Sequence, residues 1–152
     1  MAHIHEKIDF TASVLIVYKN KVLLRKHEKL GKWLQVGGHV ELDEDPNEAA
    51  MREAKEEVGL DVVLYKGEQK FMHDDGRGKE LIPPVALNRH AFSPNHEHVD
   101  LLYFATSNTD KVIPENPNDE WKWLKKEELN SLVLPPDIKF YASLALDTLG
   151  EK

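Results

Sequence analysis

The three glutamates at positions 53, 56 and 57 are the residues of this chain best placed to do chemistry. At about 100° per residue, they lie on one face of a helix. Like charges three or four residues apart destabilise a helix by roughly 0.2 to 0.5 kcal/mol per pair, and the negative end of the helix dipole adds to the repulsion. No basic residue stands three or four positions from Glu53 or Glu57, so we expect no cation of the chain itself to neutralise this face. A bound divalent cation would relieve the repulsion.

A solvated helix face is the alternative interpretation of these charges. Pairs four residues apart, such as Arg52 with Glu56, would then stabilise the helix. This interpretation leaves Glu53 and Glu57 without a partner. Ala49, one turn before Glu53, is small and leaves room for a ligand to approach the carboxylates.

The helix that carries the glutamates has clear signals at both ends. Asp45 is suited to the N-cap, Pro46 to the first helical position and Glu48 to the third, and Gly59 follows the last turn. These signals predict a helix over residues 46–58. Its buried flank is expected to consist of Ala50, Met51, Ala54 and Val58.

The residues around this helix resemble the Nudix box. The matching positions are Gly38, Glu44, Arg52, Glu53, Glu56, Glu57 and Gly59, within the segment from Gly38 to Leu60. At background frequencies of roughly 0.07, seven such matches coincide by chance on the order of 10⁻⁸ per starting point. The family commonly has a proline before the paired glycines, where this chain has Val36. Proline there would only stiffen the turn.

The resemblance implies an α/β (α+β) fold with a mixed β-sheet sandwiched between α-helices. It also implies divalent-cation-dependent hydrolysis of a nucleoside diphosphate linked to another moiety, with a metal-activated water attacking phosphorus in line. Mg²⁺ is the expected ion, and Mn²⁺ would substitute. The roles that it implies are Glu53 and Glu57 as metal ligands, Glu56 as ligand or base, the Gly38 carbonyl as a further ligand, Arg52 as orienting Glu53, and Glu44 and Gly59 as structural.

An acid outside the box is a candidate for a further ligand or base. Glu115 lies six residues before Trp121, a spacing that resembles the extra ligand glutamate of mutator-type enzymes. Glu97 and Glu120 are rivals, and an ordinary surface acid is the alternative for each.

Several residues are candidates for substrate contacts. Arg25 and Lys26 end a predicted strand near where the family often places a phosphate-binding cation, and His39 follows the paired glycines. Asp137 follows a proline pair that resembles the base-contacting segment of mutator-type relatives. The alternatives are a solvated strand end for Arg25 and Lys26, a loop cap for His39 and a helix N-cap for Asp137.

A run of histidines forms a further cluster. His96, His98 and Asp100 fall on one face of a predicted strand, because side chains alternate along a strand. Zinc is one interpretation, but no fourth ligand stands at a conventional spacing. Pocket lining, with His98 as a substrate contact, and plain exposure are the alternatives.

The remaining elements follow from apolar patterns. A hairpin is predicted over residues 10–18 and 21–26, a short strand over 33–36, and a strand with a short helix around Trp121 to Leu129. An amphipathic helix is predicted over residues 137–149, and residues 74–94 are expected to form loops.

The composition limits the classes of function. The 152 residues suit one domain spanning 1–152, and the net charge of −7 argues against binding to duplex nucleic acid. No apolar run could span a membrane and no signal peptide is visible, so a cytoplasmic protein is expected, as a monomer or homodimer. With no cysteine, disulfides and thiol catalysis are excluded.

Three functions remain as hypotheses. The leading one is hydrolysis of a nucleoside triphosphate, including oxidised forms, to monophosphate and pyrophosphate. The second keeps the chemistry but takes ADP-ribose, a nucleotide sugar or a dinucleoside polyphosphate. The third is a module that senses a nucleotide without cutting it, which the complete set of acidic residues disfavours.

Overall fold

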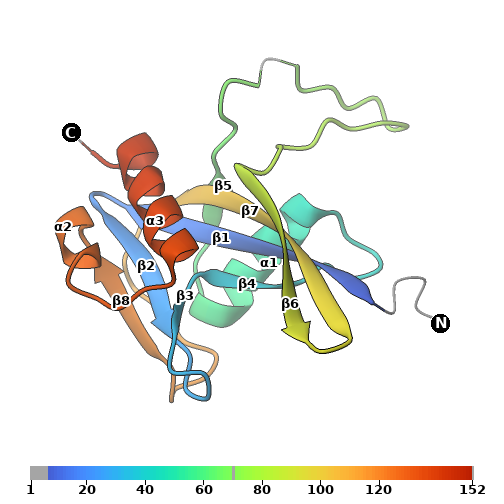
Figure 1. The fold of residues 1–152 in the computed structure, drawn as a ribbon. Helices are drawn as coiled ribbons and strands as arrows, with labels where there is room; N and C mark the ends of the chain where they lie inside the picture. The colour runs from blue at the N-terminus through green and yellow to red at the C-terminus, as the bar shows by residue number, and fades with distance from the viewer. Residues whose placement is uncertain (1–6, 70, 152) are drawn as a thin grey trace.

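The computed structural model describes residues 7–69 and 71–151. Along the described chain, four strands precede the first helix, four more follow it, and two further helices come last, in the order that Figure 1 shows. The elements are β1 (Ile8–Tyr18), β2 (Lys21–Lys26), β3 (Trp33–Leu34), β4 (Val36–His39), α1 (Pro46–Val58), β5 (Val62–Leu64), β6 (Ala86–Ser93), β7 (His96–Ser107), β8 (Glu120–Leu124), α2 (Lys126–Leu129) and α3 (Pro136–Leu149).

Within the described residues, the strands form one mixed eight-stranded sheet. The main path runs β3-β2-β1-β7-β5, while β4 pairs with β1, β6 with β7, and β8 with β2. Among the described strands, only the pairing of β1 with β7 is parallel, from Ile8 opposite Glu97 to Val17 opposite Thr106. The other pairings are antiparallel, and two of them, β1 with β2 and β6 with β7, join consecutive strands through tight turns. The mixed sheet predicted from the sequence is therefore confirmed.

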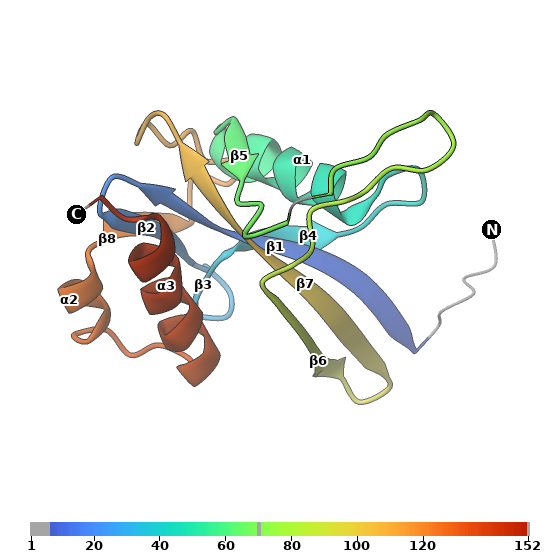
Figure 2. The ribbon, with the colours of Figure 1, turned by 90° about the horizontal axis from the view of Figure 1, so that it is seen from above.

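Helices cover both faces of this sheet, as Figure 2 shows from above. Val14 and Ile16 of β1 belong to one apolar core with α1, whereas Leu15 and Val17 belong to a second core with α3. Side chains alternate along a strand, so one apolar run of β1 supplies both cores. No helix in the described residues is long and apolar enough to cross a membrane.

Two local predictions differ from the structure. Residues 33–36 form no single strand, because the chain changes partner at Gln35: β3 pairs with β2, and β4 with β1. The last helix begins at Pro136 and not at Asp137, since proline is favoured in the first turn. In the region 74–94, where loops were expected and no strand was placed from the sequence, the structure also contains β6.

The position of Val36 explains the missing proline. Val36 begins β4, lies opposite Val14 in the ladder and is fully buried in the core against α1. A valine suits this site because it offers both an amide donor and a branched apolar side chain.

Candidate active site

The helix α1 forms where its end signals predict it. Asp45 Oδ1 accepts the amide of Glu48 at 2.9 Å, and Glu48 Oε1 accepts the amide of Asp45 at 3.1 Å. Gly59 ends the helix in the left-handed conformation, with φ of 70°. This capping box and glycine end confirm the predicted limits and place the three glutamates on adjacent turns.

Arg52 overturns the expectation that the acidic face lacks a cation of its own. Its Nη1 donates to Glu53 and to Glu56, each at 3.0 Å, and its Nη2 donates to Glu44 at 2.7 Å and to the carbonyl of His39 at 3.0 Å. The side chain of Arg52 therefore turns back over the face that the helical projection assigned to the carboxylates. Its bond to Glu44 lowers the pKa of that carboxyl. Glu44 thus joins the loop before α1 to the middle of the helix.

Gly38 lies against the carboxylate of Glu53. A Cβ added to Gly38 would overlap this group, with its Oε2 only 2.9 Å away and the other carboxylate atoms nearer still. β4 and α1 can approach so closely only because position 38 has no side chain. The structure brings Gly38 next to Glu53, and the metal-binding role of its carbonyl remains a prediction.

Glu57 is the most enclosed of the three glutamates at positions 53, 56 and 57. Its side chain is 12 % exposed, and Arg25 Nη1 of β2 lies 3.8 Å from Glu57 Oε2. Burial raises the pKa of Glu57 to about 7, although the charge of Arg25 opposes this shift. Burial likewise raises the pKa of Glu53. Arg25 is therefore a second cation of the chain that faces the glutamates. It belongs to β2, and the projection of one helix gives no information about the residues of a strand.

An unsatisfied oxygen supports a cation at this position. Among the described residues, Glu57 Oε2 is buried without a hydrogen-bond partner. A buried carboxylate oxygen without a partner costs free energy, and a divalent ion would satisfy it together with the nearby Glu53. The residues present therefore fit the divalent cation that the box implies.

The loop after β7 closes the end of α1. The amide of Ile113 donates to the carbonyl of Val58, and the amide of Glu115 donates to that of Glu57, both at 2.9 Å. Glu115 is thereby brought beside Glu57, and its charge contributes to the raised pKa there. The role of Glu115 as a ligand or base remains a prediction.

The two rivals of Glu115 have other partners. Glu97 Oε1 accepts a bond from Arg89 Nη2 at 2.9 Å, at the far end of β7, opposite Ile8. Glu120 is half exposed and lies 3.8 Å from Lys122. The structure gives neither of them a contact with the box.

Asp119 was missed by the sequence interpretation. It is 4 % exposed, accepts a bond from Arg25 Nη1 at 3.3 Å and accepts the amide of Glu28 at 3.1 Å. Trp121 completes the surroundings, with the Arg25 guanidinium 5.5 Å from its ring centroid. Asp119 belongs to no sequence motif, and only the pairing of β8 with β2 brings it to Arg25.

The other substrate candidates lie apart from these residues. Lys26 ends β2 opposite Trp33 and Glu120, and Asp137 is exposed in the first turn of α3. The N-cap position itself is Pro135, and Asp137 lies in the first turn, within the N-cap region that the alternative interpretation expected. Substrate contacts of Lys26 and Asp137 remain predictions.

The two histidine candidates lie at the end of the sheet. His39 is 59 % exposed at the end of β4, and His98 is buried in β7. Their ring centroids are 5.0 Å apart. Burial lowers the pKa of His98.

Comparisons with known proteins agree with this geometry. The model of the NUDIX domain family matches residues 8–144. An RNA pyrophosphohydrolase of Rickettsia africae is 31 % identical over 118 residues, which cover 76 % of this chain and 72 % of the relative.

Solved structures share the fold. A NUDIX-family hydrolase from Clostridium perfringens is 40 % identical, with a TM-score of 0.81, covering 93 % of this chain and 97 % of the other. A MutT NUDIX hydrolase from Burkholderia pseudomallei is 22 % identical, with a TM-score of 0.61 and coverage of 95 % and 99 %, a likeness of fold alone. The family model spans most of the chain and includes the complete box, so this chain belongs to the Nudix hydrolase family.

Proposed function

We propose that this protein hydrolyses the bond between the α- and β-phosphates of a nucleoside triphosphate, releasing a monophosphate and pyrophosphate, with Mg²⁺ as its ion. The observation that carries the proposal is the pair of enclosed carboxylates, Glu53 and Glu57, with the unpartnered Glu57 Oε2 between helix α1 and Arg25. Arg52 and Arg25 leave Glu57 Oε2 without a hydrogen bond, so a metal ion would add stabilisation there, and phosphates supply the oxygen ligands that Mg²⁺ prefers.

The chain's own residues have separate tasks in this proposal. Glu53, Glu56, Glu57 and the Gly38 carbonyl are the groups that would hold the ion, which when bound offsets phosphate charge and makes water more acidic. Arg52 holds Glu53 in position through its bonds to Glu44 and the His39 carbonyl. Glu56, half exposed and bonded to Arg52 at 3.0 Å, is the box carboxylate most open to solvent water. This openness suits a group that accepts a proton from water.

Arg25 is the cation that would meet phosphate oxygens. Its guanidinium lies between Glu57, Asp119 and the Trp121 ring, and its Nε has no hydrogen-bond partner among the described residues. A planar guanidinium held on two sides has few alternative orientations and can offer a free N–H to a phosphate.

The test is a product analysis across substrates. Purified protein with Mg²⁺ is incubated with nucleoside triphosphates, oxidised forms among them, and with ADP-ribose, nucleotide sugars and dinucleoside polyphosphates, and products are separated by ion-exchange chromatography. We expect monophosphate and pyrophosphate from a triphosphate, and no turnover by Glu53→Gln. Products from ADP-ribose, a nucleotide sugar or a dinucleoside polyphosphate alone would reject the proposed substrate. Binding without turnover of any compound would favour a sensing module.

A second candidate substrate is the triphosphate at the 5′ end of RNA. The Rickettsia relatives that are 30 to 31 % identical to this chain are named RNA pyrophosphohydrolases. The same bond is cleaved in both cases, so the carboxylates cannot distinguish them. Competition between a triphosphorylated oligonucleotide and free nucleotide decides which has the higher kcat/KM.

A further inference from the structure

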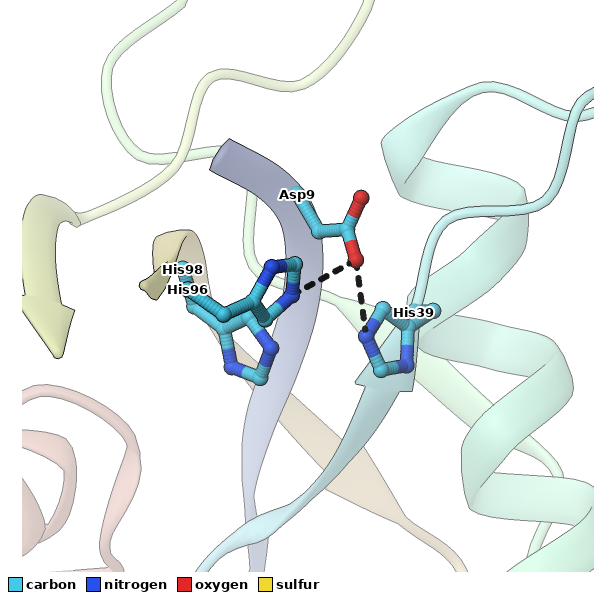
Figure 3. A group of neighbouring side chains, drawn as sticks. All are labelled: Asp9, His39, His96 and His98. Atoms are coloured by element: carbon cyan, nitrogen blue, oxygen red, sulfur yellow. Dashed lines mark ion pairs between the residues drawn. The ribbon is translucent and has the colours of Figure 1, made fainter. Parts of the chain in front are cut away.

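Four side chains from three strands converge at one end of the sheet. They are Asp9 of β1, His39 of β4, and His96 and His98 of β7 (Figure 3). Asp9 Oδ2 lies 2.9 Å from His96 Nε2 and 3.6 Å from His39 Nε2. One nitrogen or oxygen atom from each of the four side chains lies within 4.8 Å of the other three.

The strand pairing explains why these residues meet. Asp9 stands opposite His98 in the parallel pair of β1 and β7, and Thr11 stands opposite His39 in the antiparallel pair of β1 and β4. His96 and His98 share a face of β7 because side chains alternate. This is the face that packs against α3 further along the sheet, whereas Glu53 and Glu57 lie on the α1 side. The cluster is therefore separate from the carboxylates of α1.

His98 supplies an independent sign that a ligand is required. The residue is 8 % exposed, and within the described residues its Nε2 is buried without a hydrogen-bond partner. Phe92 stacks on the ring with centroids 4.9 Å apart, so the imidazole is held in one orientation. An unpaired buried nitrogen costs free energy, which a coordinated ion would relieve.

Ion pairing alone does not account for the cluster. Asp9 can accept bonds from His96 and His39 if those rings are protonated, but this leaves His98 Nε2 without a partner. A phosphate group is disfavoured because the Asp9 carboxylate lies between the imidazoles and Asp100 lies behind them. A cation, by contrast, would be attracted by these carboxylates.

The structure also corrects the ligand set expected from the sequence. Asp100 was grouped with His96 and His98, but its carboxylate is engaged by Thr11 at 2.8 Å and Ser13 at 2.6 Å. Asp9 and His39 come from distant parts of the chain and supply the missing ligands.

We propose that Asp9, His39, His96 and His98 form a site for one transition-metal ion of the Zn²⁺ class, separate from the Mg²⁺ site of α1. Three imidazole nitrogens and one carboxylate oxygen match the ligands and the coordination number of Zn²⁺, whereas Mg²⁺ prefers oxygen ligands alone. Zn–N bonds of about 2.0 to 2.1 Å place tetrahedral ligands about 3.3 Å apart. The ligand atoms, which lie within 4.8 Å of one another, would have to draw closer on binding, and the exposed His39 and the half-buried Asp9 are the side chains freest to rotate. The ion joins the ends of β1, β4 and β7.

The test measures binding of the metal alone to the full chain, prepared without a polyhistidine tag and stripped with chelator. Zn²⁺ is titrated calorimetrically in the presence of excess Mg²⁺, and Co²⁺ is used for its visible absorption spectrum. We expect one equivalent of Zn²⁺ and the intense bands of tetrahedral Co²⁺. Asp9→Asn and His96→Gln are each expected to weaken Zn²⁺ binding by at least about tenfold and to abolish those bands.

Matched variants separate this site from others. His90→Gln removes a histidine whose ring is 5.6 Å from His98 but which is outside the group, and it should bind Zn²⁺ as the unaltered chain does. A Glu53→Gln, Glu57→Gln double variant should do the same. Because His98 is buried, Asp9→Asn and His39→Gln serve as the more exposed variants, with folding checked by circular dichroism.

Three outcomes would overturn the proposal. The first is unchanged Zn²⁺ binding in Asp9→Asn and His96→Gln. The second is loss of Zn²⁺ binding in the double glutamate variant. The third is loss of Zn²⁺ binding in a His3→Gln, His5→Gln variant, whose two histidines lie outside the described residues.

Discussion

Arg25 and Glu57 face each other across the interface between the sheet and α1, with Nη1 3.8 Å from Oε2 and both side chains largely enclosed. Thirty-two positions separate them in the sequence, and only the pairing of β2 and β4 with β1 brings them together. The most enclosed of the three glutamates 53, 56 and 57 therefore has a partner that no helical spacing reveals.

Replacing Arg25 with Met should shift the acid side of the pH–rate profile. The charge of Arg25 lowers the pKa of Glu57, so its loss raises that pKa further, and a larger fraction of Glu57 is protonated at a given pH. We expect the acid limb of kcat/KM to move to higher pH. Lys21→Met removes the same charge from the same face of β2, further from Glu57, and should leave the limb in place. An unshifted limb in Arg25→Met would show that Glu57 does not govern it.

Stability without metal should depend on the protonation of Glu57. Burial raises the pKa of Glu57 to about 7 in the folded protein, from an ordinary value of 4.5. Between these values the folded state holds a proton that the unfolded state has lost, so stability falls as pH rises from about 4.5 to about 7, by at most about 3 kcal/mol.

Glu57→Gln should remove this contribution. In EDTA at pH 8 the variant is expected to melt at the same temperature as the unaltered chain or higher, and the difference between them should vanish near pH 4.5. Glu56→Gln removes the same charge at a half-exposed position. This variant is expected to keep the fold and to lose stability between pH 4.5 and about pH 7 as the unaltered chain does. A lower melting temperature of Glu57→Gln in EDTA at pH 8 would contradict the role given to burial.

Gly38→Ala should impair turnover more than folding. The new Cβ would overlap the Glu53 carboxylate, which must then move away from its position beside Arg52. Displacing a catalytic group by about 1 Å costs on the order of 10²-fold in rate, and we expect a loss of at least this size. Gly78→Ala is the control, because a Cβ there meets nothing within 4 Å. The measurement is kcat at saturating Mg²⁺. Equal kcat values for Gly38→Ala and Gly78→Ala would reject the prediction that a side chain at position 38 displaces Glu53.

Arg52→Ala should destabilise the fold as well as reduce activity. Its loss leaves the enclosed Glu44 and Glu53 carboxylates and the His39 carbonyl without their donor. We expect the free energy of unfolding to fall by about 2 to 3 kcal/mol. Lys55→Ala on the same helix removes only an exposed pair with Asp61 and should change it by less than about 0.5 kcal/mol. Urea denaturation of both variants gives the comparison.

The amino-acid sequence alone determined the helix α1 and the spacing of its glutamates. Asp45, Pro46, Glu48 and Gly59 act on neighbouring backbone groups, so their effects are readable from local order. The hairpin of β1 and β2 is equally local, with Val17 opposite Val22. The box spacing also indicated the family, which the comparison confirmed.

Tertiary structure decided which of the more distant charges meet. The bonds of Arg52 to Glu53 and Glu56 were expected from the sequence, but those to Glu44 and the His39 carbonyl were not, because a long side chain can turn toward a loop that the projection omits. Asp119 reaches Arg25 only through the pairing of β8 with β2.

The cluster at the sheet end shows the same division. The alternation of His96 and His98 was visible in the sequence, whereas Asp9 and His39 join them only because β1 pairs with both β7 and β4. Strand pairing depends on contacts between residues as distant as Val22 and Leu124, 102 positions apart, and these contacts leave no periodic signal in the sequence.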